Sequence, residues 1–302
     1  MLAILNVVMP AFIIMGIGFY IGKHRNPDLA FTADLGVSVL IPCLVLDSII
    51  TTDIPLVDLG KIVLYSLLVT FAFVFFTIFV GKYVLHIEED KLNSFILISS
   101  FPNTGNFGLP VALFAFGPLG QAITLICSTA QTILCNTFGI YYASKNNYSM
   151  KEALKNVVKT PGFIAVFLAI LIKVSGIPLP EMILRPIHLI GQAVVPVLLI
   201  CLGVQQSRTI PATLKQMLLP SVFGKFVMYP VLAFILLIPF FDPWSTTGRI
   251  IILAAFYPTA AAINTFVLKF DPENNAVPTG TLITNVLSVF VLFVVLFFLM
   301  PH

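Results

Sequence analysis

The chain of 302 residues is 59% hydrophobic and only 10% charged, and its mean hydropathy is +1.04. This composition lies outside the range of soluble domains and indicates an integral protein of a lipid bilayer. The formal net charge of +3 is small and spread over loops, which argues against a nucleic-acid partner. The longest polar stretch covers only residues 144–160, too few for a soluble catalytic or nucleotide-binding domain.

A helix needs about 20 apolar residues to cross a membrane, and on that scale the sequence predicts ten membrane-spanning segments. They cover residues 2–22, 34–50, 61–81, 92–117, 119–143, 161–177, 182–205, 216–239, 249–269 and 276–300. No basic residue precedes the first segment, and Lys23 and Arg25 follow it. We therefore expect this segment to stay in the protein as a helix rather than to be a cleaved secretory signal. The predicted fold class is an all-α integral membrane protein.

Lysines and arginines favour one of the two sides that alternate along this map. Eleven lie in the loops after segments one, three, five, seven and nine, and only four lie in the other loops. The first group is Lys23, Arg25, Lys82, Lys91, Lys145, Lys151, Lys155, Lys159, Arg208, Lys215 and Lys269, and the second is Lys61, Lys173, Arg185 and Arg249. Because cytoplasmic loops are enriched in Lys and Arg, the sequence predicts a multi-pass protein of the cell membrane, plasma or inner, with both termini extracytoplasmic.

The segments form two similar sets of five. The first five-helix repeat covers residues 1–143, a cytoplasmic linker covers residues 144–160, and the second repeat covers residues 161–302. In each repeat the second segment has a proline near its middle, Pro42 or Pro196, and the fourth segment is interrupted. An odd number of spans per repeat inverts one repeat relative to the other. Inverted repeats place a substrate site near the bilayer midplane, where discontinuous helices meet.

The interruption in the fourth segment covers residues 101–110, with the sequence Phe-Pro-Asn-Thr-Gly-Asn-Phe-Gly-Leu-Pro. About ten helical residues precede it, a rise of about 15 Å, which is half of a hydrocarbon core about 30 Å thick. Proline removes a backbone donor, glycine permits unusual dihedral angles, and Asn and Thr are helix-capping residues. Lipid offers no hydrogen bonds, so unwound backbone at this depth lines a cavity or is surrounded by protein. We predict a substrate site here, and a simple kink filled by a neighbouring helix is the alternative.

A half-helix that starts at such a break presents free N–H groups and about half a positive charge, which attract an anion. Asn103 and Thr104 can add side-chain donors. At the equivalent depth of the second repeat, residues 257–265 contain one proline, three consecutive alanines and an asparagine. The predicted substrate-binding residues are Pro102, Asn103, Thr104, Gly105, Asn106, Pro258, Thr259 and Asn264.

Four further polar residues within the segments are candidates for the cavity or for ion coupling. Gln131 and Asn285 fall on the segments that follow the two breaks. Lys225 lies about ten residues into its segment, where a bare charge costs about 2.5 kcal/mol or more, so it must snorkel, pair or serve a function. Asp47, near the outer end of its segment, is either a capping residue or a proton-coupling carboxylate. A histidine side chain can carry protons, and for His188 packing or an interfacial position is the preferred interpretation.

Cys43, Cys127, Cys135 and Cys201 lie in apolar runs without the spacing of metal ligands, and we predict packing roles for them, no metal and no cofactor. An intramembrane enzyme needs a metal motif, a Ser and His pair, or two membrane aspartates. The sequence has no His-Glu-x-x-His motif and only four histidines. We therefore predict that the protein is not an enzyme.

Several of these residues resemble the auxin efflux carrier family over nearly the whole chain. The run Pro102-Asn103-Thr104, followed by Gly108 and Pro110, is similar to the pattern of the family's fourth helix, Pro258 matches the proline that interrupts its ninth helix, and Pro10, Pro42 and the pair Leu202-Gly203 occupy corresponding positions. The family includes the plant PIN proteins and bacterial malate and malonate permeases. The resemblance implies ten helices as an inverted 5+5 repeat, crossing helices four and nine, an elevator-like motion of a transport part against a scaffold part, and a homodimer.

The resemblance also implies that Asn103 contacts a substrate carboxylate. The loop between the repeats is short, and Gly105 stands where family members have an aliphatic residue. We therefore expect a small carboxylate such as malate or malonate in preference to an auxin-like acid. Two alternatives remain open: a sodium-coupled carrier of the bile acid symporter type, although the predicted crossing contains no acidic residue, and an anion channel, although channels usually build their pores from symmetric subunits.

Overall fold

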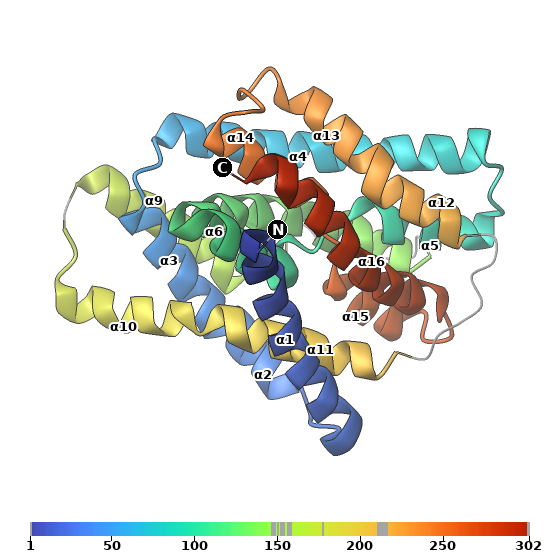
Figure 1. The fold of residues 1–302 in the computed structure, drawn as a ribbon, viewed down its shortest axis with the longest axis horizontal. Helices are drawn as coiled ribbons and strands as arrows, with labels where there is room; N and C mark the ends of the chain where they lie inside the picture. Colours follow the sequence, from blue (N-terminus) through green and yellow to red (C-terminus); the bar gives the residue numbers. More distant parts are fainter. Residues whose placement is uncertain are drawn as a thin grey trace.

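The computed structural model describes residues 2–145, 159–176, 178–209 and 217–300, together with residues 149, 151 and 155. Within these residues the regular elements are all helices, packed as a bundle around three hydrophobic clusters (Figure 1). Seven helical stretches of the described chain are long and apolar enough to cross a membrane, and three shorter apolar helices accompany them. The prediction of an all-helical membrane protein is confirmed.

Short π-helical stretches, labelled η, continue several of the α-helices. The first predicted repeat contains α1 (Leu2–Arg25), α2 (Ala30–Leu35), η1 (Gly36–Leu40), α3 (Ile41–Thr51), α4 (Leu56–Phe79), η2 (Val80–Val84), α5 (Glu89–Ser100), η3 (Thr104–Gly108), α6 (Leu109–Leu134), η4 (Cys135–Gly139) and α7 (Ile140–Ala143). The second contains α9 (Pro161–Ser175), α10 (Glu181–Gln192), α11 (Val194–Ser207), α12 (Leu218–Phe223), η5 (Gly224–Met228), α13 (Tyr229–Leu237), α14 (Thr246–Ala255), α15 (Ala261–Phe270) and α16 (Ala276–Leu299). Most of the predicted linker, residues 144–160, lies outside the described residues.

Each predicted segment coincides with one or more of these helices, and the boundary between segments four and five falls inside α6. Gly117 has a φ of 67° and a ψ of −158°, and Pro118 follows it. Only glycine adopts this backbone conformation without strain, and the proline has no N–H to donate, so the helical path turns here. The stretch 104–143 is therefore one long helical run that bends where the sequence predicts a connection. The number of membrane crossings stays a prediction.

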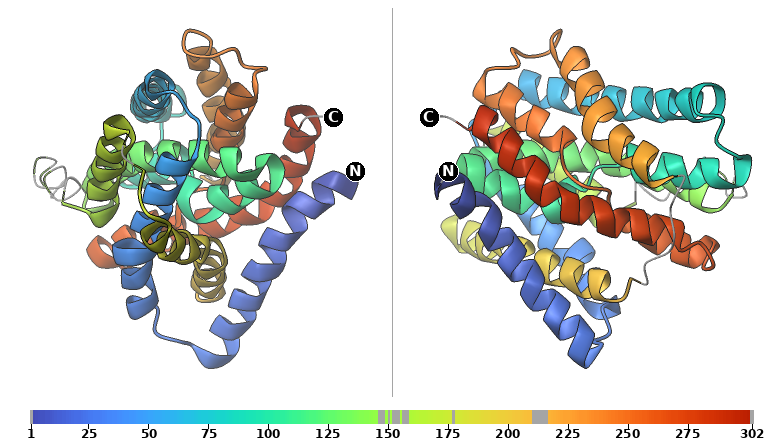
Figure 2. Two further views of the ribbon diagram at one scale, coloured as in Figure 1. Left: turned by 90° about the vertical axis from the view of Figure 1, so that its left-hand side faces the viewer. Right: turned by 45° about the vertical axis from the view of Figure 1, so that its right-hand side comes forward.

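The first turn of α1 and the last turn of α16 lie on the same side of the molecule (Figure 2). The connections between α4 and α5 and between α15 and α16 lie on the opposite side. An even number of membrane crossings requires this arrangement of the two chain ends.

Helices α1 and α11 pack with their backbones in close contact through glycines. A Cβ atom at Gly18 would lie 2.2 Å from the carbonyl oxygen of Ile200, and one at Gly203 would lie 2.0 Å from the carbonyl oxygen of Met15. Gly18 and Gly22 form a Gly-x-x-x-Gly pattern on α1. Small residues at this spacing let membrane helices approach closely, because packing replaces the hydrophobic effect as the driving force in lipid.

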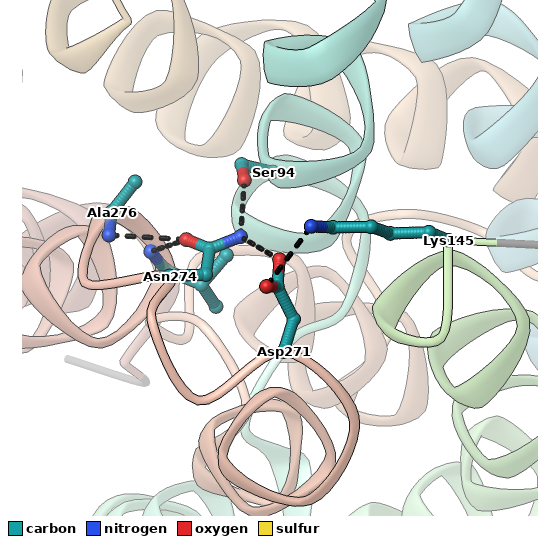
Figure 3. A network of polar contacts seen from close by, with 6 residues as sticks. Ser94, Lys145, Asp271, Asn274 and Ala276 are labelled. Atoms are coloured by element: carbon teal, nitrogen blue, oxygen red, sulfur yellow. Dashed lines mark hydrogen bonds and ion pairs between the residues drawn. The ribbon is translucent and has the colours of Figure 1, made fainter.

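A polar network ties four parts of the chain together at one end of the bundle (Figure 3). The amide nitrogen of Asn274 donates to Ser94 Oγ at 3.0 Å and to Asp271 Oδ2 at 3.2 Å, and its oxygen accepts from the N–H of Ala276 at 3.1 Å. Lys145 Nζ lies 3.0 Å from Asp271 Oδ1. The network therefore fixes the ends of α5, α15 and α16 relative to the segment after α7.

The glycine contact between α1 and α11 generates a stability prediction. Gly18→Ala places a methyl group on the backbone of α11 and should destabilise the fold by about 1–3 kcal/mol, the usual effect of overpacking. The melting temperature of the purified protein in detergent measures the loss. Gly16→Ala, on the same helix with nothing within 4 Å of its Cβ position, is the matched control. Equal shifts for the two variants would contradict the close contact.

Candidate functional site

Two helices of the described chain are interrupted where the sequence predicts breaks. Helix α5 ends at Ser100 and the helical path resumes at Thr104, while α14 ends at Ala255 and α15 begins at Ala261. At both breaks the chain leaves the helical conformation, because Pro102 and Pro258 disfavour helical dihedral angles in the residue that precedes each of them.

The two unwound stretches pair with each other as a short antiparallel bridge. The N–H of Asn103 donates to the carbonyl oxygen of Pro258 at 2.7 Å, and the N–H of Ala260 donates to the carbonyl oxygen of Phe101 at 2.8 Å. Unwound backbone at membrane depth must have its polar groups satisfied inside the protein. Each break therefore supplies hydrogen-bonding partners that the other break needs, and the bridge is where the two halves of the chain meet.

Thr259 fastens this bridge to the neighbouring helices. Its hydroxyl donates to the carbonyl oxygen of Ile98 on α5 at 2.6 Å, and its N–H donates to Thr284 Oγ1 on α16 at 3.2 Å. The two threonine hydroxyl oxygens lie 3.1 Å apart. The side chain is fully buried, and its hydrogen bonds connect the bridge to both α5 and α16. We call this set of hydrogen bonds the Thr259 clasp.

A polar cavity of about 110 Å³ lies on one side of the bridge. Its lining comes from the break before α6, from one face of α6 and η4, and from the start of α15. The polar lining residues are Asn103, Thr104, Asn106, Ser128, Gln131, Thr132 and Asn136, and the others are Phe101, Pro102, Gly105, Cys135, Ala260 and Ala262. All of the described polar lining residues are uncharged, so the cavity offers hydrogen bonds without a fixed ionic partner.

Asn103 has an amide donor available for a ligand. The residue is only 4% exposed, its Oδ1 accepts from the N–H of Asn106 at 3.2 Å, and its carbonyl oxygen accepts from the N–H of Gly108 at 2.9 Å. The Nδ2 atom is buried and has no partner within the protein. An unsatisfied buried donor costs about 1–3 kcal/mol, so an acceptor oxygen in the cavity would recover that free energy.

Two helix N-termini face the same cavity. The path through η3 into α6 begins at Thr104, and Thr104, Gly105 and Asn106 all line the cavity. Helix α15 begins at Ala261, between the lining residues Ala260 and Ala262. The first N–H groups of a helix have no intrahelical acceptor and carry the positive end of its dipole. Their convergence favours an anion in the cavity without any charged side chain, while the carbonyl end of α5 reaches the cavity at Phe101.

Gln131, predicted as a secondary candidate, also lines the cavity. The hydroxyl of Thr104 donates to Gln131 Oε1 at 2.8 Å. The donor expected from Thr104 is therefore used to orient Gln131, and the amide nitrogen of Gln131 is the end that remains for a ligand. From the sequence we expected the Thr104 hydroxyl to donate to the ligand. In the structure this hydroxyl donates to Gln131, whose own amide nitrogen is the donor nearest to that expected position.

The structure places the predicted residues of the second break outside the cavity. Pro258 and Thr259 hold the bridge, and Asn264 accepts a hydrogen bond from the hydroxyl of Thr281 on α16 at 2.9 Å. Asn285 is buried, donates to the carbonyl oxygen of Thr281 at 2.8 Å and lines a separate cavity between α1, α11 and α16. On this side of the bridge Asn264 bonds to Thr281 and Thr259 bonds to Thr284, whereas Asn285 Oδ1 is buried without a partner.

The remaining two candidates lie apart from the cavity lining. Lys225 is fully buried, its Nζ has no hydrogen-bond partner in the described chain, and it lies 4.7 Å from the centre of the Tyr229 ring, so it does not snorkel. Asp47 is buried within α3, about one turn before its end, and its Oδ2 lies 2.8 Å from Nδ1 of His188 on α10. The other ring nitrogen of His188 lies 2.6 Å from Nε2 of Gln192.

Four polar or thiol residues of α6 and η4 were not predicted as part of the site: Ser128, Thr132, Cys135 and Asn136. Together with Gln131 they follow the spacing of one helical face, at positions i, i+3, i+4, i+7 and i+8. A stripe of polar residues along one face of an otherwise apolar segment was therefore the sequence signal that could have identified them.

Comparison with known proteins gives two matches. The chain matches the profile of a family described as "Membrane transport protein" over residues 3–296. It is also 32% identical, over 167 residues, to an uncharacterized transporter from Methanocaldococcus jannaschii. That alignment covers 52% of this chain and 52% of the relative, so the aligned part spans about half the length of each protein.

The clasp made by Thr259 generates a second stability prediction. Thr259→Val removes the hydroxyl that bonds Ile98 and Thr284 and should destabilise the protein by about 1–3 kcal/mol, since it leaves buried polar atoms without this partner. Thermal unfolding in detergent measures the effect. Thr129→Val is the matched control, because the Thr129 hydroxyl bonds only a carbonyl of its own helix, at Leu125. A Thr259→Val protein as stable as this control would contradict the clasp.

Proposed function

This chain belongs to the membrane transport protein family, the family of the auxin efflux carriers, and from that membership we propose that it is a secondary transporter of small organic anions. The family resemblance expected from the Pro-Asn-Thr motif is thereby confirmed, and the activity of the family is transport across a membrane rather than catalysis. The substrate class and the mechanism rest on the cavity beside the bridge.

The observation that supports an anion is the unpartnered amide donor of Asn103 in a cavity faced by two helix N-termini. Hydrogen bonds to a charged group are worth about 1.5–3 kcal/mol, more than those between neutral groups. A carboxylate is planar and accepts several such bonds at once, so Asn103, Gln131 and the free N–H groups near Gly105 and Ala262 can share it.

The size of the cavity supports a small substrate. Its volume of about 110 Å³ is well below the 300–1,000 Å³ typical of pockets for drug-sized ligands. Malonate or malate is therefore the substrate class that we propose, in preference to an auxin-like acid with an aromatic ring.

We propose that Lys225 supplies a positive charge behind the cavity. Lys225 lies near Cys135, which lines the cavity, and its burial without a partner disfavours the ammonium form until an anion approaches. A charge in a water-poor environment acts over a longer distance than one in water. The buried ammonium group would thus offset part of the charge of an incoming carboxylate without touching it.

For the transport step, we propose alternating access with an elevator-like motion of the bridge and its supporting helices. The proposed repeats are residues 1–143 and 161–302, inverted and giving ten crossings. Helix α1 packs against α11, and α3 packs against α9 and α10, whereas α5 packs with α4, α7 and α16, and α6 packs with α4 and α14. We use this grouping to assign a scaffold part and a transport part, which meet where α1 packs against α6 and α16 and where α3 packs against α6. A cell-membrane location with both termini outside and a homodimeric assembly belong to the same proposal.

The proposed substrate site can be tested by replacing the amide nitrogen of Asn103 with an oxygen. Asn103→Asp keeps the oxygen that caps Asn106 but replaces the free donor by a negatively charged oxygen. Binding of malonate should weaken at least about tenfold, the equivalent of about 1.4 kcal/mol. Ligand-induced thermal shift and counterflow in proteoliposomes measure binding and transport.

Asn264→Asp, outside the cavity, is the matched control and should bind malonate like the wild type. Normal transport by Asn103→Asp would overturn the site assignment.

The same assays test the two alternative functions. Running both with and without sodium tests the sodium-coupled carrier. Unitary currents in place of saturable counterflow would indicate a channel.

The role of Lys225 is tested by Lys225→Met. Replacing this unpartnered buried amine by an apolar side chain should leave the melting temperature unchanged or raise it, because a buried polar group without a partner destabilises the fold. The affinity for malonate should nevertheless fall. Lys61→Met, which removes a surface lysine paired with Asp58, is the control and should leave the affinity unchanged. Wild-type affinity in Lys225→Met would refute the proposed electrostatic role.

A further inference from the structure

A second cavity of the described chain is apolar and lies away from the proposed substrate site. Its volume is about 570 Å³, and it lies between α3 and α9 on one side and α4 and α6 on the other. We call it the lateral groove. It is lined by Val45, Ile49, Leu56, Leu59, Gly60, Val63, Leu64, Leu67, Leu125, Ile126, Thr129, Ala130, Ile133, Phe163, Val166, Ile170 and Val174.

The lateral groove offers nothing for a polar ligand to bind. Thr129 is the only described lining residue with a polar side chain, and its hydroxyl already donates to the carbonyl oxygen of Leu125 at 2.9 Å. An ordered water molecule needs two to four polar partners, and a cavity of about 150 Å³ with apolar walls stays dry and binds benzene instead. Water is therefore a poor occupant of a groove of this size and chemistry.

The lateral groove runs along the membrane-spanning direction and opens at its sides. Along α9 it extends from Phe163 to Val174, a rise of about 16 Å at 1.5 Å per residue. Leu64 and Val174 in its wall are 51% and 63% exposed. Helices α3, α4 and α9 lie near one another at one end of the molecule (Figure 1). An apolar chain from the surrounding bilayer can therefore enter the groove from the side.

We propose that the lateral groove binds an acyl chain of a membrane phospholipid. Protein interiors tolerate few voids larger than a water molecule, and hydrocarbon is the available material that matches the apolar walls. Each CH₂ group transferred into such a site contributes a small favourable term, so a long chain binds where a small solute would not.

One lysine at the end of the lateral groove suits a phospholipid headgroup. Lys173 precedes the lining residue Val174 and donates to carbonyl oxygens of Ile49, which lines the groove, and Thr52. Lys61 and Asp58 lie on the opposite face of α4, where Lys61 Nζ is 5.6 Å from the centre of the Phe241 ring. A lipid phosphate would therefore bind the ammonium group of Lys173.

Gly60 is the residue that keeps the lateral groove open on α4. A Cβ atom built at Gly60 has nothing within 4 Å, so a larger side chain at this position would extend into free space of the groove. The groove also shares α6 with the polar cavity, because Ala130 and Ile133 line the groove while Gln131 and Thr132 line the cavity. On the proposed transport function, the bound chain would set how easily α6 moves past α3 and α9.

The first test locates the chain directly. The purified full-length protein in detergent is mixed with a small excess of phosphatidylethanolamine that has a photoreactive diazirine in one acyl chain, and labelled residues are identified by mass spectrometry. We expect labels within residues 56–67 and 163–174. Equal labelling of Phe290 and Val294, exposed residues of α16 outside the groove, would overturn the site.

The second test fills the groove. Gly60→Trp should lower the amount of phosphatidylethanolamine retained in native mass spectrometry about tenfold, the equivalent of about 1.4 kcal/mol. Leu68→Trp, on α4 but not in the groove lining, is the control and should retain the lipid. If Gly60→Trp does not fold, Val63→Phe fills the same space. Wild-type retention by a folded groove-filling variant would overturn the proposal.

These experiments distinguish a failure of the lipid-binding proposal from a failure of the transport proposal. A Gly60→Trp protein that loses the lipid and transports at the wild-type rate would refute the effect on α6 and would support both the lipid site and the transport function. A wild-type protein that binds the lipid but transports no carboxylate would count against the proposed function alone.

Discussion

The arrangement of this protein depends on two unwound stretches that hydrogen-bond to each other inside the membrane. Either stretch alone would leave backbone groups without partners in a medium that supplies none. The bonds between Asn103 and Pro258 and between Ala260 and Phe101 solve that problem for both. The same pairing directs the starts of α6 and α15 toward one place, because each helix resumes immediately after its bridge residues. The convergence of these two helix starts on the cavity is thus a geometric consequence of satisfying the backbone.

Helix α6 connects the main features of the molecule. One of its faces carries the polar stripe of the cavity, and the adjacent face forms part of the lateral groove. Its bend at Gly117 and Pro118 sets where the stripe begins relative to the bridge. On the two proposals made above, a single helix therefore contacts both the substrate and the bound lipid, and a displacement of α6 changes both environments at once.

The sequence predicted the breaks well because proline and glycine act locally. Pro102 and Pro258 stop their helices whatever surrounds them, and the capping residues Asn103 and Asn106 belong to the same local signal. The directions of the side chains depend on tertiary packing and could not be derived. Thr259 and Asn264 turn toward α16, because Thr284 and Thr281 offer them partners there. The polar stripe from Ser128 to Asn136 was visible as helical spacing but carried no sign of which helix it would face.

The two sides of the bridge differ in how their polar side chains are satisfied. On one side Asn103 Nδ2 is buried next to the cavity without a hydrogen-bond partner, and on the other side Thr281 bonds to Asn264 and Thr284 bonds to Thr259, while Asn285 Oδ1 has no partner. On the proposed transport function, this asymmetry favours one solute per polypeptide in each cycle, held against the side whose threonines are already bonded.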